Sequence, residues 1–280
     1  MTAGSTGTVL SSDGTRIAFE ASGSGPALVL VAGALGYKDF PYLRKFAAEF
    51  AKDFQVFSYD RRGRGGSTDT KPYTVQKEID DLAAVCREAG GSPIVLGISS
   101  GAALALEAAA AGAPFGRLVA FEAPYMVGSH RKSEHARYEA ELARLLAGDH
   151  RDAALRLFMR TVGVPAVFVA IMRLLPFWKG LRLTAHTLSY DAAVMRGFEL
   201  PAARLAGIRV PTLVAGGAKS PESLKAAVRS VAKAVPGARR VEIPKQSHAI
   251  NAAALLPFVR QFARDQGTQE VSFTNADQGQ

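Results

Sequence analysis

The clearest chemical signal in the sequence is a serine held between two glycines. The segment G-I-S-S-G, residues 97–101, directly follows a predicted strand at 93–98 and directly precedes a predicted helix at 101–111. Small residues two positions before and after a serine allow a sharp strand–turn–helix, which lifts the hydroxyl above the sheet at the helix N-terminus. We therefore predict that Ser99 is a nucleophile. A Gly/Ser loop that only caps a helix is the alternative.

A serine hydroxyl needs a general base, and one histidine stands where such a base is expected. His248 lies in P-K-Q-S-H-A, between a strand predicted at 240–243 and a helix predicted at 252–265. The order nucleophile, acid, histidine along the chain is typical of proteins that carry the serine on this kind of turn. The other four histidines all lie between residues 125 and 200. We therefore predict that His248 is the base.

The acid that orients the histidine has two candidates. It usually follows the penultimate strand, but the sequence there reads T-L-V-A-G-G-A-K-S-P-E-S, with Lys219 and Ser220 at the expected positions. Glu122 instead closes the strand after the nucleophile helix, from where a carboxylate can reach the histidine and fix its tautomer. We expect Glu122 to be the acid, with Glu222 as the alternative acid. A Glu122 that only pairs with an arginine of the inserted segment is the third interpretation.

Two backbone amides are predicted to bind the negative charge that develops on an attacked carbonyl oxygen. Ser100, the residue after the nucleophile, provides one of them. Ala34, in the loop V-A-G-A-L-G-Y after an early strand, provides the other. Small residues in that loop let the backbone approach a substrate closely. A simple glycine turn is the alternative for the loop.

The elements that must position these residues alternate between strand and helix. Short apolar runs bounded by Gly and Pro predict buried strands at 27–31, 54–59, 93–98, 118–121, 212–215 and 240–243. Helical patterns stand between them at 40–50, 75–88, 101–111, 222–235 and 252–265. This alternation predicts an α/β fold with a mostly parallel, doubly wound sheet. Residues 8–10 and 16–20 predict an antiparallel hairpin at its edge.

The alternation breaks between residues 125 and 200, where the patterns are helical. We predict a helical lid (cap) there, inserted into a core of residues 1–124 and 201–264 and lying over the carboxyl ends of the strands. Residues 265–280 are polar and predict a flexible tail.

Trp178 is the main candidate for substrate contact. It is the single tryptophan and is predicted to lie in a loop bounded by Pro and Gly rather than on a helix. An aromatic and methionine stripe at helical spacing is also typical of a core. The other candidate substrate-binding residues are Leu35, Tyr125, Phe158, Met159 and Tyr190.

Composition limits the class of protein. The chain has 280 residues, 48% of them hydrophobic, which suits one sizeable core. The net charge of +9 is spread along the chain without a dense basic block, so we expect no nucleic-acid partner. No apolar stretch is long enough to span a bilayer, no secretory signal is visible, and the lone Cys86 is typical of a buried thiol in a reducing cytosol. We therefore expect a cytoplasmic protein with no membrane partner. A homodimer stays an alternative to a monomer, because an apolar lid helix can serve dimerisation as well as substrate binding.

Four features together resemble a known superfamily. The turn G-I-S-S-G-A, the loop D-R-R-G-R-G-G-S, the inserted helical segment and the terminal histidine are similar to α/β-hydrolases across residues 8–264. Within that superfamily, the doubled serine, F-E-A-P, G-G-A-K-S-P-E-S and P-F-W-K-G resemble zearalenone-hydrolase-type lactonases, although V-A-G-A-L-G departs from their D-G-L-G. This resemblance implies that the acid stands at Glu122 and that Trp178, on the lid, packs on a macrocyclic lactone.

The residues and the resemblance together predict a serine hydrolase. It would cleave a small-molecule carboxylic ester or lactone through an acyl-enzyme on Ser99, and this chemistry needs neither a metal nor an organic cofactor. Two alternatives stay open. One is a non-hydrolytic acyltransferase or cyclase of secondary metabolism that uses the same residues, and the other is a ligand-binding protein on the same scaffold.

Overall fold

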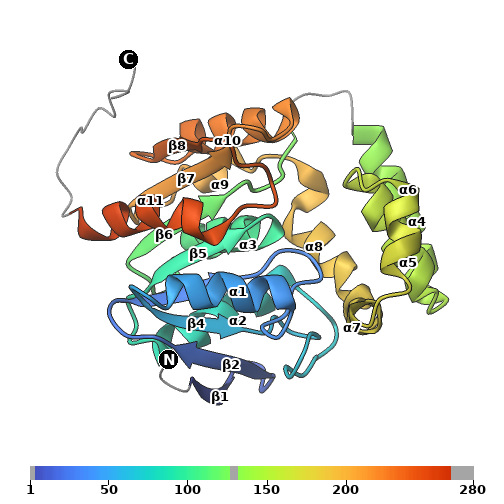
Figure 1. Ribbon diagram of the computed structural model, residues 1–280, viewed down its shortest axis with the longest axis horizontal. Helices are drawn as coiled ribbons and strands as arrows, with labels where there is room; N and C mark the ends of the chain where they lie inside the picture. Colours follow the sequence, from blue (N-terminus) through green and yellow to red (C-terminus); the bar gives the residue numbers. More distant parts are fainter. Residues whose placement is uncertain (1–3, 127–131, 266–280) are drawn as a thin grey trace.

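Eight strands form one sheet, and the candidate residues follow its parallel strands. The computed structural model describes residues 4–126 and 132–265 (Figure 1). The strand order is β1-β2-β4-β3-β5-β6-β7-β8. β2 pairs antiparallel with β1 and with β4, and all other neighbours are parallel, so the carboxyl ends of β3 to β8 meet at one edge. The strands are β1 (Ser5–Leu10), β2 (Arg16–Ser22), β3 (Ala27–Val31), β4 (Gln55–Tyr59), β5 (Ile94–Ile98), β6 (Arg117–Phe121), β7 (Thr212–Gly217) and β8 (Arg239–Ile243).

Helices cover both faces of the sheet. Two of them pack on one face, at the front of Figure 1, and the other four share the apolar cluster of the opposite face. The front pair is α1 (Pro41–Phe50) and α11 (Ala252–Arg264), and the others are α2 (Val75–Glu88), α3 (Ser100–Ala110), α9 (Ala202–Leu205) and α10 (Glu222–Ala234). The predicted doubly wound sheet and edge hairpin are confirmed, with element ends that differ from the predicted ones by a few residues. Cys86 lies on α2 and is fully buried, as predicted.

The chain between β6 and β7 is helical and forms its own apolar cluster. We call its helices α4–α8 the helical insert, and α4, α5 and α6 stand beside the sheet at the right of Figure 1. Its members are α4 (Lys132–Ala147), α5 (Arg151–Thr161), α6 (Ala166–Met172), α7 (Phe177–Thr184) and α8 (Leu188–Val194), with 3₁₀ turns at Ala185–Thr187 and Arg196–Phe198. None of the helices in the described ranges is long and apolar enough to cross a membrane.

One local prediction in the insert is wrong. Trp178 is on a helix, α7, and is 5% exposed, whereas the sequence predicted a loop bounded by Pro and Gly. The helix continues through Gly180, where a Cβ atom would come within 2.5 Å of the Tyr37 hydroxyl. That glycine therefore permits close packing and does not end the helix. Residues 127–131 of the predicted lid and 266–280 of the predicted tail lie outside the described residues.

Candidate active site

Ser99 stands on a strained turn between β5 and α3. Its backbone has φ 57° and ψ −126°, in a region that L-residues rarely occupy. A Cβ on Gly97 would come within 2.5 Å of the Gly101 carbonyl, and a Cβ on Gly101 within 2.3 Å of the Val31 carbonyl. Both glycines are therefore required for the turn to pass this close to the sheet. The turn leaves the Ser99 side chain only half-buried.

Ser99, His248 and Glu122 form one hydrogen-bonded chain. His248 Nε2 lies 3.1 Å from Ser99 Oγ, and His248 Nδ1 lies 2.7 Å from Glu122 Oε2. The three residues come from different segments, because Ser99 follows β5, Glu122 follows β6 and His248 stands between β8 and α11. The His248 side chain is 41% exposed and Glu122 is fully buried. In this geometry His248 can accept the proton of a serine that substrates can reach, while the buried carboxylate orients the imidazole.

Glu122 lies in a space that two glycines leave open. Its second oxygen, Oε1, accepts a hydrogen bond of 2.7 Å from the Gly217 amide, and a Cβ on Gly216 would come within 3.4 Å of the same oxygen. These glycines end β7, where an acid was expected and none is present. Burial alone would favour the protonated acid, but hydrogen bonds, with that to His248 the strongest, hold the pKa of Glu122 below its ordinary value. The carboxylate is therefore ionised beside the imidazole.

The alternative acid lies elsewhere. Glu222 is the first residue of α10, is exposed, and forms an ion pair with Arg229 two turns further along that helix. The structure brings Glu122, and not Glu222, to the histidine.

The two predicted amides flank Ser99 and are available to a ligand. Among the described residues, the N–H groups of Ala34 and Ser100 donate to no protein acceptor. Gly33 packs directly on the nucleophile, since a Cβ there would lie 3.1 Å from Ser99 Cβ. The loop after β3 thus lies against the turn of Ser99, which leaves both amides as candidates for binding a substrate carbonyl oxygen.

A buried charge network behind the site was not predicted from the sequence. Asp191, on α8, accepts hydrogen bonds from Arg61 (2.7 Å), Arg64 (2.8 Å) and the Ser100 hydroxyl (2.8 Å). Both arginine side chains are fully buried. Burial alone would favour the neutral acid, but Arg64 and Arg61 lower the pKa of Asp191. The network therefore joins the helical insert to the residue that follows the nucleophile.

The same network holds the loop after β3. Arg64 also donates to the carbonyl oxygens of Gly33 (2.7 Å) and Gly36 (3.3 Å). Asp60 is held by backbone amides, which donate to it from Lys38 (2.6 Å) and Gly66 (2.8 Å). The loop that carries Ala34 is thus fixed by charged groups, which favours a preformed site for negative charge.

Four of the predicted substrate-binding residues lie in one apolar cluster, and two do not. Leu35, Met159 and Trp178 are buried in the cluster of the helical insert, and the half-buried Phe158 packs against it. Leu35 follows Ala34 directly, so this cluster borders the loop beside Ser99. Tyr125 and Tyr190 are elsewhere. Tyr125 belongs to the core cluster of the sheet, whereas Tyr190 stacks on Tyr73 and donates to Asp69.

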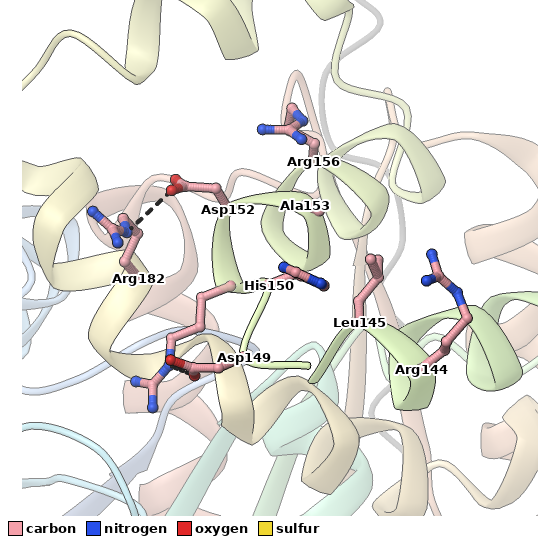
Figure 2. Close-up of a pocket in the computed structure, with 9 residues that line it drawn as sticks. Arg144, Leu145, Asp149, His150, Asp152, Ala153, Arg156 and Arg182 are labelled. Carbon is pink, nitrogen blue, oxygen red and sulfur yellow. Dashed lines mark hydrogen bonds and ion pairs between the residues drawn. The ribbon is translucent and has the colours of Figure 1, made fainter. Parts of the chain in front are cut away.

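A separate hollow of about 500 Å³ opens between α4, α5 and α7 of the insert (Figure 2). Three of the four arginines that line it are already paired, because Arg182 contacts Asp152, Arg151 contacts Asp149 and Arg144 contacts Glu141. Asp152 also accepts from the Trp178 indole at 2.7 Å. None of the lining residues belongs to the chain of hydrogen bonds at Ser99. The hollow is therefore a feature of the insert's own packing.

The chain is similar to solved structures of hydrolases. An alpha/beta hydrolase from Sphaerobacter thermophilus DSM 20745 is 44% identical over 92% of this chain and 100% of that chain, with a TM-score of 0.82. An enol-lactonase from Burkholderia xenovorans LB400 shares the fold at 23% identity, covering 92% of this chain and 100% of its own, with a TM-score of 0.68. An esterase from Rhodococcus sp. ECU1013 shares the fold at 20% identity, covering 92% of this chain and 98% of its own, with a TM-score of 0.64. No curated protein matches the chain.

The model of one protein family matches most of the chain. It is described as the alpha/beta hydrolase family and matches residues 28–261. This range begins in β3, contains the turn of Ser99, the strand end of Glu122 and the loop of His248, and ends within α11. The chain belongs to the alpha/beta hydrolase family.

Proposed function

We propose that the protein is a serine hydrolase that cleaves a carboxylic ester or lactone with a Ser99–His248–Glu122 triad. The observation that carries the proposal is the chain of two hydrogen bonds, 3.1 Å from Ser99 to His248 and 2.7 Å from His248 to Glu122. Such a chain is the geometry that a serine nucleophile requires, because the hydroxyl is weak without an adjacent base and the base needs an orienting acid.

The reaction proceeds in two halves. Ser99 Oγ attacks the carbonyl carbon while His248 Nε2 takes its proton, and the amides of Ala34 and Ser100 stabilise the resulting oxyanion. The tetrahedral intermediate expels the alcohol, which receives the proton from His248, and an acyl-enzyme remains. Water then attacks the acyl carbon with His248 as base, and the acid is released from Ser99. Glu122 stays ionised throughout and stabilises the imidazolium.

The proposed substrate is an apolar ester or lactone. The apolar cluster of Leu35, Met159 and Trp178 borders the proposed oxyanion loop, so it can contact an apolar acyl or alcohol group. The helical insert would act as a lid on this side of the site. The resemblance to zearalenone-hydrolase-type lactonases favours a lactone ring, and an enol-lactonase among the structural neighbours is consistent with this choice.

A graded substrate screen tests the proposal. The wild-type protein and Ser99→Ala are assayed against p-nitrophenyl acylates of increasing chain length and against lactones of increasing ring size. We expect turnover that disappears in Ser99→Ala and is higher for apolar substrates. Turnover that survives in Ser99→Ala refutes the mechanism, whereas binding of these compounds without turnover in the wild type points to a ligand-binding protein.

A further inference from the structure

Exposed apolar side chains are concentrated on one part of the helical insert. Nine large hydrophobic residues are exposed in the described ranges, and seven of them lie between residues 162 and 183. The most exposed is Leu174, at 85%, and Phe168 is 57% exposed. We call this group the apolar patch. It consists of Val162, Val167, Phe168, Ile171, Leu174, Leu175 and Leu183.

The helix at the centre of the apolar patch has almost no buried side. α6 has the sequence A-V-F-V-A-I-M, and Val169 is its one buried residue. A helix that is apolar all round is normally buried in a core or in lipid. Large contiguous apolar surfaces on a monomer mark sites of contact with a protein or a membrane. The patch therefore needs an apolar partner outside the described chain.

The sequence segment that carries the apolar patch contains basic residues and no acidic ones. Residues 153–190 contain no Asp or Glu and five basic residues, all of them exposed. Arg173 directly follows α6, Arg160 lies in the last turn of α5 before it, and Lys179 lies on α7. The five are Arg156, Arg160, Arg173, Lys179 and Arg182. Among the described residues, four of the five form no ion pair, whereas Arg182 contacts Asp152 of α5. A net basic rim around exposed leucine and phenylalanine side chains favours a partner that is apolar inside and anionic at its surface.

We propose that the apolar patch docks on an anionic lipid surface. Phe168, Ile171 and Leu174 would enter the boundary between headgroups and acyl chains, as the apolar side chains of interfacial helices do. Arg160 and Arg173 would remain at the level of the headgroups, where basic residues are attracted to anionic lipids. This is a peripheral contact made by one short helix, and it leaves the protein on one side of the bilayer.

A second copy of the chain fits the apolar patch less well than lipid does. A two-fold symmetric interface places the same surface of both subunits together, so the five basic residues of one copy would approach those of the other. Juxtaposed like charges destabilise an interface, and among the described residues Arg182 alone of the five is paired with an acid, Asp152. The proposal does not depend on the chemistry at Ser99, so vesicle binding and ester hydrolysis can fail separately.

The test is sedimentation with vesicles of two compositions. The full-length protein is mixed with vesicles of phosphatidylcholine alone or of phosphatidylcholine with an equal amount of phosphatidylglycerol. We expect pelleting with the anionic vesicles, little with phosphatidylcholine, and weaker binding as salt screens the charges. Phe168→Ser and Leu174→Ser should each lower the partition coefficient about tenfold. Arg160→Gln and Arg173→Gln should each lower it about fivefold.

Leu10→Ser is the matched control, because Leu10 is also exposed, at 68%, but lies on β1 at the sheet edge. It should bind vesicles as the wild type does, and thermal melting should show that all variants fold. Light scattering in solution tests the competing interpretation, in which the apolar patch forms a dimer. A dimer that Leu174→Ser dissociates would assign the patch to a second copy and overturn the proposal. Equal binding of wild type and Phe168→Ser, or no binding to anionic vesicles, would overturn it as well.

Discussion

Replacing Glu122 by glutamine exchanges one carboxylate oxygen for an NH₂ group and should abolish most of the activity. The carboxylate accepts from His248 Nδ1 at 2.7 Å and from the Gly217 amide at 2.7 Å. If the glutamine oxygen keeps the Gly217 contact, its NH₂ group faces His248 and can only donate. The imidazole then carries its proton on Nε2 and presents a donor to Ser99, so it can no longer accept the serine proton.

The size of the effect follows from this tautomer change. The comparable substitution in a serine protease triad lowers kcat by about four orders of magnitude. Glu122 is completely buried, like the acid of that triad, so solvent cannot replace it. We expect kcat for Glu122→Gln to fall by about 10³- to 10⁴-fold, which corresponds to about 4–5.5 kcal/mol. KM should change little, because the buried carboxylate makes no contact that a substrate could share.

Stopped-flow or long-time-course assays with a p-nitrophenyl ester measure this loss, and thermal melting separates it from unfolding. Glu222→Gln is the matched control, because it makes the same chemical change at an exposed residue whose partner is Arg229. It should leave kcat within error of the wild type. If Glu222→Gln loses the activity and Glu122→Gln keeps it, the assignment of the acid is wrong.

Three further predictions concern the surroundings of the site. Asp191→Asn leaves Arg61 and Arg64 buried without their shared carboxylate, so urea denaturation should show a loss of about 3–5 kcal/mol; an unchanged midpoint would count against the network. Trp178→Phe removes the indole hydrogen bond to Asp152 and should cost about 1 kcal/mol of stability with little change in kcat/KM. The phenyl ring keeps the apolar surface that can contact a substrate, so unchanged stability is the result that would contradict the role of the indole hydrogen bond. Burial raises the pKa of Cys86 to about 12, so Ellman's reagent should react with the unfolded protein and not with the native one; rapid native reaction would contradict the buried position.

The positions of Ser99, His248 and Glu122 relative to the strands could be predicted because they depend on local pattern and topology. A strand, a turn with two glycines and a helix follow from residues close together in the sequence. Parallel strands then bring their carboxyl ends to one edge, which places a residue after β6 near a loop after β8. The sequence also indicates that the usual position after β7 has no acid and that Glu122 follows the neighbouring strand, β6.

The buried network and the helix of Trp178 could not be predicted in the same way. Arg61 and Asp191 are 130 residues apart, and their contact depends on how α8 packs over the sheet. The loop D-R-R-G-R-G-G-S has no local feature that selects Asp191 as a partner for its arginines. The sequence predicts that Gly180 bounds a loop, but the lack of a side chain at Gly180 leaves room for Tyr37 to pack against α7. This contact depends on tertiary packing. Tertiary contacts override local propensity in both cases.

Labelling with a fluorophosphonate tests the serine mechanism most directly, because the probe reacts with an activated serine without requiring the natural substrate. Intact-protein and peptide mass spectrometry of the wild type, Ser99→Ala and Ser100→Ala locate the adduct. We predict one adduct on Ser99 in the wild type and in Ser100→Ala, and none in a folded Ser99→Ala. An adduct on Ser100, or a folded wild-type protein that takes up no probe, would contradict the assignment of Ser99 as the nucleophile.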